Sequence, residues 1–208
     1  MNLKELNTLE GSELKTALKN NKADLIAEKK ASVKYTDNLS APSTVTIPSE
    51  TLKKSLASPD PSADSTAPFM VTVVCNTANF CDSYMDVLTE DSYTKSIEAR
   101  GITIPHIADH NHESTAHIGD VKAVYTKKLR CKDLGFNSEA ETTALLMDTL
   151  VRADYNEKVY QFYKAQKINQ HSIGLRYVDI QLALNSQVED DQEEYAVWQK
   201  YYPSIVNK

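Results

Sequence analysis

The alternation of hydrophobic and polar residues predicts several strands in the second two thirds of the chain. The segment "FMVTVVC" is rich in β-branched residues, and "IGDVKAVYTKKL" and "TTALLMDTLVRA" have the same character. A fourth segment, "HSIGLRYVDIQLAL", predicts a long strand beginning at His171. Side chains alternate between the faces of a strand, so Ser172, Gly174 and Arg176 would share one face and His171 would point to the other.

Two further segments in the same region have the signals of helices. In "TEDSYTKSIEARG", Thr89 can cap a helix that stops at Gly101. In "DYNEKVYQFYKAQKIN", Asp154 and Glu157 have the spacing of a capping box. The hydrophobic stripe of this second helix predicts core packing for Tyr155, Val159, Phe162 and Tyr163.

These patterns divide the chain into three parts. Residues 1–38 predict a solvated, lysine-rich helical arm, and residues 39–68 hold five of the seven prolines with many serines, which is typical of a linker. Residues 69–208 form the main domain. Its strands and helices follow no strict βαβ alternation, so the predicted class is α+β, or a β-barrel with helices packed outside.

Composition narrows the possible partners. The net charge of -6 and the scattered basic residues disfavour a nucleic-acid surface. No hydrophobic run approaches 18 residues, and the charged N-terminus lacks a signal-peptide core, so we expect a cytoplasmic protein that does not bind membranes. Three cysteines without CxxC spacing predict reduced thiols and no structural zinc site; they are Cys75, Cys81 and Cys131.

Ser172 is a candidate nucleophile, because the small Gly174 would leave room beside it and Arg176 would place a cation near a developing oxyanion. A serine nucleophile needs a base, and neutral imidazole is the usual one. His171 would point away from Ser172, so the base should come from the cluster "HIADHNHESTAH". That cluster supplies His106, His110, His112 and His117.

The same cluster has two other interpretations. Several imidazoles and Asp109 within a few residues could hold a metal ion, which would make the protein a metal-dependent hydrolase using the His106–His117 cluster. However, the H-x-H-x-D-H pattern is incomplete, since Ser114 and Thr115 stand where an aspartate and a histidine belong. The cluster could also be a polar loop of solvated histidines.

The order of four segments resembles that of the prohead maturation proteases of tailed bacteriophages. These segments are "MVTVVCNTANFCDSYMDVLTEDSYTKSI", "IPHIADHNHESTAHIGDVKAVY", "TTALLMDTLVRA" and "QKINQHSIGLRYV". That family is similar in fold to the herpesvirus assembly proteases, which are β-barrels wrapped by helices, and it uses a serine nucleophile and a histidine base. The resemblance implies Ser172 as nucleophile and His110 as base, with His112 as the second choice.

It also implies a serine endopeptidase that needs no cofactor. Such an enzyme would cut scaffold polypeptide, scaffolding segments of the major capsid protein and itself, inside the procapsid in the host cytoplasm. Self-association is expected, and self-cleavage could remove the N-terminal arm and linker.

One feature departs from the family pattern. No strand of the type "Glu-(Val/Gly)-Ser-Ala-Val" follows the serine strand, although such a strand completes the barrel in many members and often carries the acidic third residue. We therefore expect a barrel that lacks its last strand in this chain, and the third catalytic residue stays unassigned. Asp109 is adjacent to the proposed base in the sequence, which makes an orienting contact difficult. The other acidic candidates, in the run 189–194, are typical of a solvated surface. A catalytically inactive structural capsid component with the same fold is the first alternative.

Overall fold

The computed structural model describes residues 3–6, 8–35, 47–48, 66–168 and 170–208. The chain divides into two compact units, one of residues 1–35 with 174–205 and one of residues 36–173 with 206–208. The predicted division placed residues 174–205 in the main domain, whereas they fold with the N-terminal helices. Most of the predicted linker lies outside the described residues.

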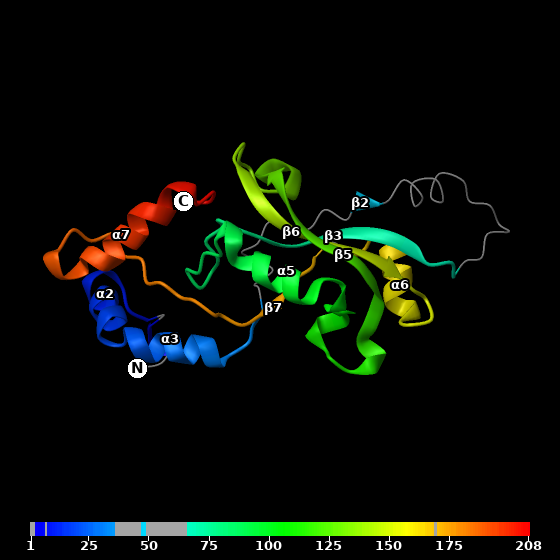
Figure 1. The fold of residues 1–208 in the computed structure, drawn as a ribbon, viewed down its shortest axis with the longest axis horizontal. Helices are drawn as coiled ribbons and strands as arrows, with labels where there is room; N and C mark the ends of the chain where they lie inside the picture. The colour runs from blue at the N-terminus through cyan, green and yellow to red at the C-terminus, as the bar shows by residue number, and fades with distance from the viewer. Residues whose placement is uncertain (1–2, 7, 36–46, 49–65, 169) are drawn as a thin grey trace. The chain divides into compact units, whose positions relative to one another are not determined.

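The second unit is built on an antiparallel five-stranded sheet of order β2-β3-β6-β5-β4. The sheet curls like half of a barrel, so the α+β class is confirmed (Figure 1). Its strands are β2 (Ile47–Pro48), β3 (Phe69–Thr77), β4 (His106–Ile107), β5 (His117–Arg130) and β6 (Glu141–Val151). The segments "FMVTVVC", "IGDVKAVYTKKL" and "TTALLMDTLVRA", which were predicted as strands, correspond to β3, β5 and β6 respectively.

Burial explains why apolar residues stand next to one another in β3 and β6. Val71 and Val73 of β3 and Val151 of β6 are fully buried in one core cluster, and Leu146 of β6 is buried in a second cluster on the other face. A strand that is covered on both faces has no solvent side, so hydrophobic residues need not alternate with polar ones.

The long strand predicted from His171 is wrong. Only Gly174–Leu175 (β7) is a strand, and it pairs with β1 (Lys34–Tyr35) of the N-terminal segment. Gly174 and Arg176 therefore belong to the first unit, and Ser172 lies in an irregular segment of the second. The expected shared face of Ser172, Gly174 and Arg176 does not form.

Helix α5 (Thr94–Arg100) follows a 3-10 turn, and Gly101 ends it with a φ of 47°, as predicted. Helix α6 (Glu157–Lys164) begins later than its predicted capping box. Its cap is Asn156, whose side chain accepts a hydrogen bond from the Val159 N–H at 3.1 Å. The 3-10 turns of the second unit are η1 (Glu90–Tyr93), η2 (Gly101–Thr103), η3 (Ala108–His110), η4 (Ser114–Ala116) and η5 (Cys131–Leu134).

The buried face of α6 differs from the predicted stripe. Tyr160 and Tyr163 are 1% and 4% exposed and belong to the core cluster, while Tyr155 and Phe162 of the predicted stripe are each 39% exposed. Val159 is partly buried against the same cluster. The predicted stripe was therefore only partly correct, because Tyr155 lies before the helix begins and the buried face of the helix includes Tyr160 in place of Phe162.

The first unit holds α1 (Leu3–Leu6), α2 (Gly11–Asn20), α3 (Lys22–Ala31), η6 (Glu189–Asp191), α7 (Gln192–Tyr201) and η7 (Tyr202–Ser204). Asp191 and Glu194 are buried, and they pair with Lys19 and Lys22; the Lys22–Glu194 contact measures 2.6 Å. The expectation of a fully solvated acidic run is therefore wrong for these two carboxylates. Partnered lysines allow carboxylates to be buried, and they lower the pKa of both.

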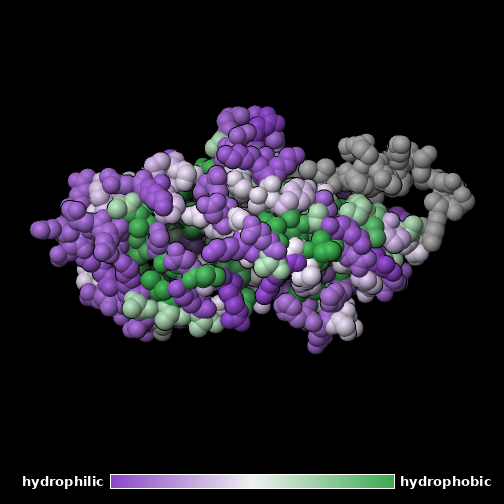
Figure 2. Space-filling view, viewed as in Figure 1, coloured by the Kyte–Doolittle hydropathy of each residue, from purple (hydrophilic) through white to green (hydrophobic). Residues whose placement is uncertain are grey.

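Hydrophilic residues cover much of the visible face, and hydrophobic residues show between them in groups (Figure 2). Within the described part of the chain, no helix combines the length and the apolar character needed to cross a bilayer.

Gly119 lies where β5 runs directly against β6 and leaves no room for a side chain. A Cβ atom at this position would lie 2.3 Å from the backbone oxygen of Leu150, and backbone cannot move aside as a flexible side chain can. Gly119 pairs with His106 of β4 and with Val151 of β6. This close approach therefore also positions β4, which begins the histidine loop of residues 106–117.

We expect Gly119→Ala to lower the free energy of unfolding by about 3 kcal/mol, because overpacking against backbone displaces a strand. Urea denaturation measures this change. The matched control is Lys127→Gln on the same strand, where an exposed side chain should change stability by no more than about 0.5 kcal/mol. Equal stability of the two variants would contradict the close approach.

Candidate active site

Ser172 and His110 meet in the second unit, although 62 residues separate them in the sequence. The Nε2 atom of His110 lies 2.5 Å from the Oγ atom of Ser172, and both side chains are partly buried. Ser172 comes from the segment after α6, and His110 ends the 3-10 turn η3. This hydroxyl–imidazole contact has the geometry of a serine nucleophile with its base.

The backbone that presents His110 adopts an uncommon conformation. Asp109 has a φ of 52° and His110 a φ of 54°, both in the left-handed region. Asp and His enter this region more readily than most residues, but each such position still costs about 1–3 kcal/mol. Strained backbone persists only where its surroundings impose it, and here it turns the imidazole toward Ser172.

His110 is suited to accept a proton. Burial lowers the pKa of its imidazole, the neighbouring His112 lowers it further, and the Asp109 carboxylate opposes both effects. The net shift is downward, so the imidazole is neutral at pH 7 and its Nε2 lone pair is available to the serine hydroxyl.

The other histidines have different surroundings. His112 is exposed, and His117 begins β5, where it pairs with Ile107. His106 is 5% exposed within the core. Across the described residues, no group of three or more His, Cys, Asp and Glu side chains is arranged to hold a metal ion.

His106 and His171 take part in a buried hydrogen-bonded chain that sequence reasoning missed. The His106 Nδ1 atom lies 3.1 Å from the Thr149 Oγ1 atom, and its Nε2 atom lies 3.0 Å from the Tyr163 hydroxyl. The same hydroxyl lies 2.6 Å from the His171 Nε2 atom. The only sequence signal was a tyrosine among apolar helix positions, which is equally typical of ordinary core packing.

Both buried imidazoles are held neutral. Burial lowers the pKa of His106 to about 3, with a contribution from His171, and burial lowers the pKa of His171 to about 4. A charged imidazole would lose its hydration in this part of the core without a carboxylate to replace it.

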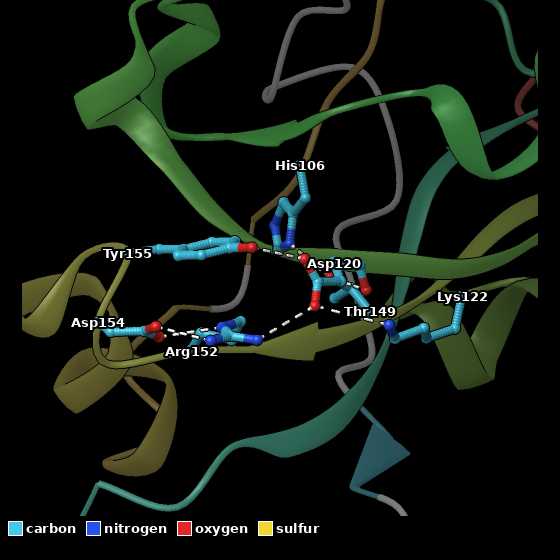
Figure 3. A network of polar contacts seen from close by, with 7 residues as sticks. All are labelled: His106, Asp120, Lys122, Thr149, Arg152, Asp154 and Tyr155. Carbon is cyan, nitrogen blue, oxygen red and sulfur yellow. Dashed lines mark hydrogen bonds and ion pairs between the residues drawn. The ribbon is translucent and has the colours of Figure 1, made fainter.

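From His106, the hydrogen-bonded chain continues through Thr149 to a surface network around Asp120 (Figure 3). The Thr149 hydroxyl donates to the backbone oxygen of Asp120 at 3.5 Å, and the Asp120 carboxylate accepts a hydrogen bond from the Tyr155 hydroxyl at 2.8 Å. Arg152 lies within ion-pair distance of Asp120, at 3.6 Å, and forms a two-pronged contact with Asp154. These contacts explain why Tyr155 and Asp154 face solvent before α6.

Comparisons of the chain with protein-family models, with curated proteins and with solved structures find no match.

The two buried histidines predict a loss of stability in acid. Each has a folded-state pKa below the ordinary value near 6.5, so the unfolded chain binds more protons as the pH falls. Their contribution is fully present above pH 6.5 and decreases as the pH falls toward 4. We expect His106 and His171 together to remove about 3–4 kcal/mol of stability between pH 7 and pH 5, measured by urea denaturation.

His106→Gln should remove about half of this pH dependence, because one of the two titrating groups is gone. His112→Gln is the control, since the exposed His112 ring lies outside the buried chain. Full acid sensitivity in the His106 variant would show that the buried imidazole is not its source.

Proposed function

We propose that the protein is a serine endopeptidase of phage capsid maturation, with Ser172 as nucleophile and His110 as base. The observation that carries this proposal is the contact between the Ser172 hydroxyl and the neutral His110 imidazole. The strained backbone at Asp109 and His110 supports it, because such strain is concentrated at functional sites.

In this mechanism, His110 Nε2 takes the proton of the Ser172 hydroxyl as Oγ attacks the carbonyl carbon of a peptide bond. The resulting imidazolium gives the proton to the leaving amine, and an acyl-serine remains. His110 then takes a proton from a water molecule as the water oxygen attacks the acyl carbon. The imidazolium returns this proton to the departing Ser172 Oγ, which frees the serine and the new carboxyl end of the product. No cofactor takes part in these steps.

The substrate class comes from the resemblance to the prohead proteases. The order of the strand, histidine-loop and serine segments supports it, and so does the curled antiparallel sheet, which is compatible with the barrel of herpesvirus assembly proteases. The substrates would be scaffold polypeptide, scaffolding segments of the major capsid protein, and the enzyme itself inside the procapsid.

Ser172→Ala should abolish cleavage of co-expressed capsid protein, with a loss of several orders of magnitude in rate. His110→Ala should be as damaging, and the double variant no worse, because the two side chains act as a unit. His112→Ala is the matched control, and its effect should be mild. Gel analysis of the processed capsid protein and labelling with a fluorophosphonate provide the measurements.

Four results would contradict the proposal. Normal processing by Ser172→Ala excludes this nucleophile, and a larger effect at His112 than at His110 excludes this base. A wild-type chain that neither processes capsid protein nor reacts with the reagent would be the inactive structural component. Loss of activity with a chelator, without labelling at Ser172, would indicate the metal-dependent alternative.

A further inference from the structure

One hydroxyl connects the two segments that carry the proposed catalytic pair. The Tyr163 hydroxyl contacts the Nε2 atoms of His106 at 3.0 Å and His171 at 2.6 Å. His106 lies four residues before His110, and His171 immediately precedes Ser172. Tyr163 itself is on α6, so the link is anchored outside both segments.

One arrangement of protons satisfies every contact in this chain. Thr149 donates to the Asp120 backbone oxygen, so its own oxygen accepts from the Nδ1–H of His106. His106 Nε2 then carries a lone pair and accepts from the Tyr163 hydroxyl, whose oxygen accepts from the Nε2–H of His171. Every hydrogen bond then donates in the same direction, from His171 through Tyr163, His106 and Thr149 to the Asp120 backbone oxygen.

The remaining atom of the chain is consistent with this order. His171 Nδ1 is buried and has no hydrogen-bond partner among the described residues. With the proton on Nε2, that atom is a lone pair and not an orphaned donor, which is the less costly of the two alternatives. The tyrosine proton is thereby committed to His106, and the contact with His171 depends on the tyrosine oxygen.

The link is rigid because its centre is buried. Tyr163 is 4% exposed, and its ring packs in the core cluster that contains Val71, Val73 and Val151. Water therefore cannot readily replace the hydroxyl as a partner of either imidazole. In contrast, Ser172 lies in a segment that is neither helix nor strand.

We propose that Tyr163 is a positioning residue, whose hydroxyl ties the His106 and His171 segments together and so holds Ser172 Oγ within reach of His110. This inference rests on the proposed function, since it assigns Tyr163 a part in the same site. The residue touches neither Ser172 nor His110 in any contact described above, and it acts through the two histidines.

The test compares Tyr163→Phe with Tyr160→Phe. Both changes remove one hydroxyl from a buried tyrosine of α6, but the Tyr160 hydroxyl donates to the Ala67 carbonyl oxygen at 2.8 Å and not to a histidine. Two quantities are measured well below the unfolding temperature. One is the rate at which a fluorophosphonate phosphonylates Ser172, with loss of fluoride, and the other is the pKa of His110 from an NMR titration of its imidazole protons.

We expect Tyr163→Phe to slow phosphonylation about 100-fold, because a displacement of about 1 Å at a reacting atom has an effect of that order. The pKa of His110 should rise toward its ordinary value as the partly buried imidazole becomes more exposed. Tyr160→Phe should leave both quantities as in the wild type. Equal phosphonylation rates and equal pKa values in the two variants would overturn the inference.

A second pair of variants changes His171, the other partner of the Tyr163–His171 contact. His171→Gln keeps an N–H donor near the position of Nε2, whereas His171→Leu keeps the bulk without the donor. We expect the glutamine variant to retain most of the phosphonylation rate and the leucine variant to behave like Tyr163→Phe. Equal rates in the two His171 variants would count against a hydrogen-bonded link.

The measurements distinguish a failure of the peptidase proposal from a failure of the proposed role of Tyr163. If wild-type Ser172 does not react, the peptidase proposal fails, and the His110 titration alone then decides the link. A rise in the pKa of His110 in Tyr163→Phe but not in Tyr160→Phe supports the link. No rise in either variant refutes it.

Discussion

His106 is buried in the core, and there an imidazole must have hydrogen-bond partners for its nitrogens. The rest of the site follows from this constraint. Thr149 of β6 satisfies one nitrogen and Tyr163 of α6 satisfies the other, which fixes α6 against the sheet. Because the Tyr163 hydroxyl also accepts from His171, the segment with Ser172 is held by the same contact.

Residues 106–110, which lead to the proposed base, are positioned from both ends. At the start, His106 pairs with Gly119 across β4 and β5, and the absence of a side chain at Gly119 lets β5 lie directly against the Leu150 carbonyl. At the end, Asp109 and His110 adopt left-handed backbone angles. The stability of the sheet offsets the cost of these angles, and the result is an imidazole that faces Ser172 in its neutral form.

The first unit illustrates a different use of charge. Its buried acids, Asp191 and Glu194, are partnered by Lys19 and Lys22 from the N-terminal helices. Breaking such a pair would leave a buried charge without compensation, which is strongly destabilising. Residues 1–35 and 174–205 form one unit, although 172 positions separate Lys22 from Glu194.

Much of the architecture could be predicted from the sequence. Strands β3, β5 and β6 follow from β-branched runs, the end of α5 from Gly101, and the α+β class from their order, because these are local properties of the chain. The predicted cap Thr89 instead precedes the 3-10 turn η1, and its side chain makes no capping hydrogen bond there. Ser172 and the histidine cluster could also be selected as candidates from residue chemistry. The distance between Ser172 and His110, however, depends on contacts over 62 residues.

Three features were decided only by the tertiary structure. The segment after His171 is apolar enough for a long strand, but within the described part of the chain only Gly174–Leu175 forms a strand, paired with Lys34–Tyr35. Asp191 and Glu194 belong to an acidic run of ordinary appearance, and only packing against lysines buries them. Tyr163 has the pattern of a core residue. Its hydroxyl has a role only because folding brings two histidines from distant segments to the same oxygen, and no local pattern encodes such a meeting.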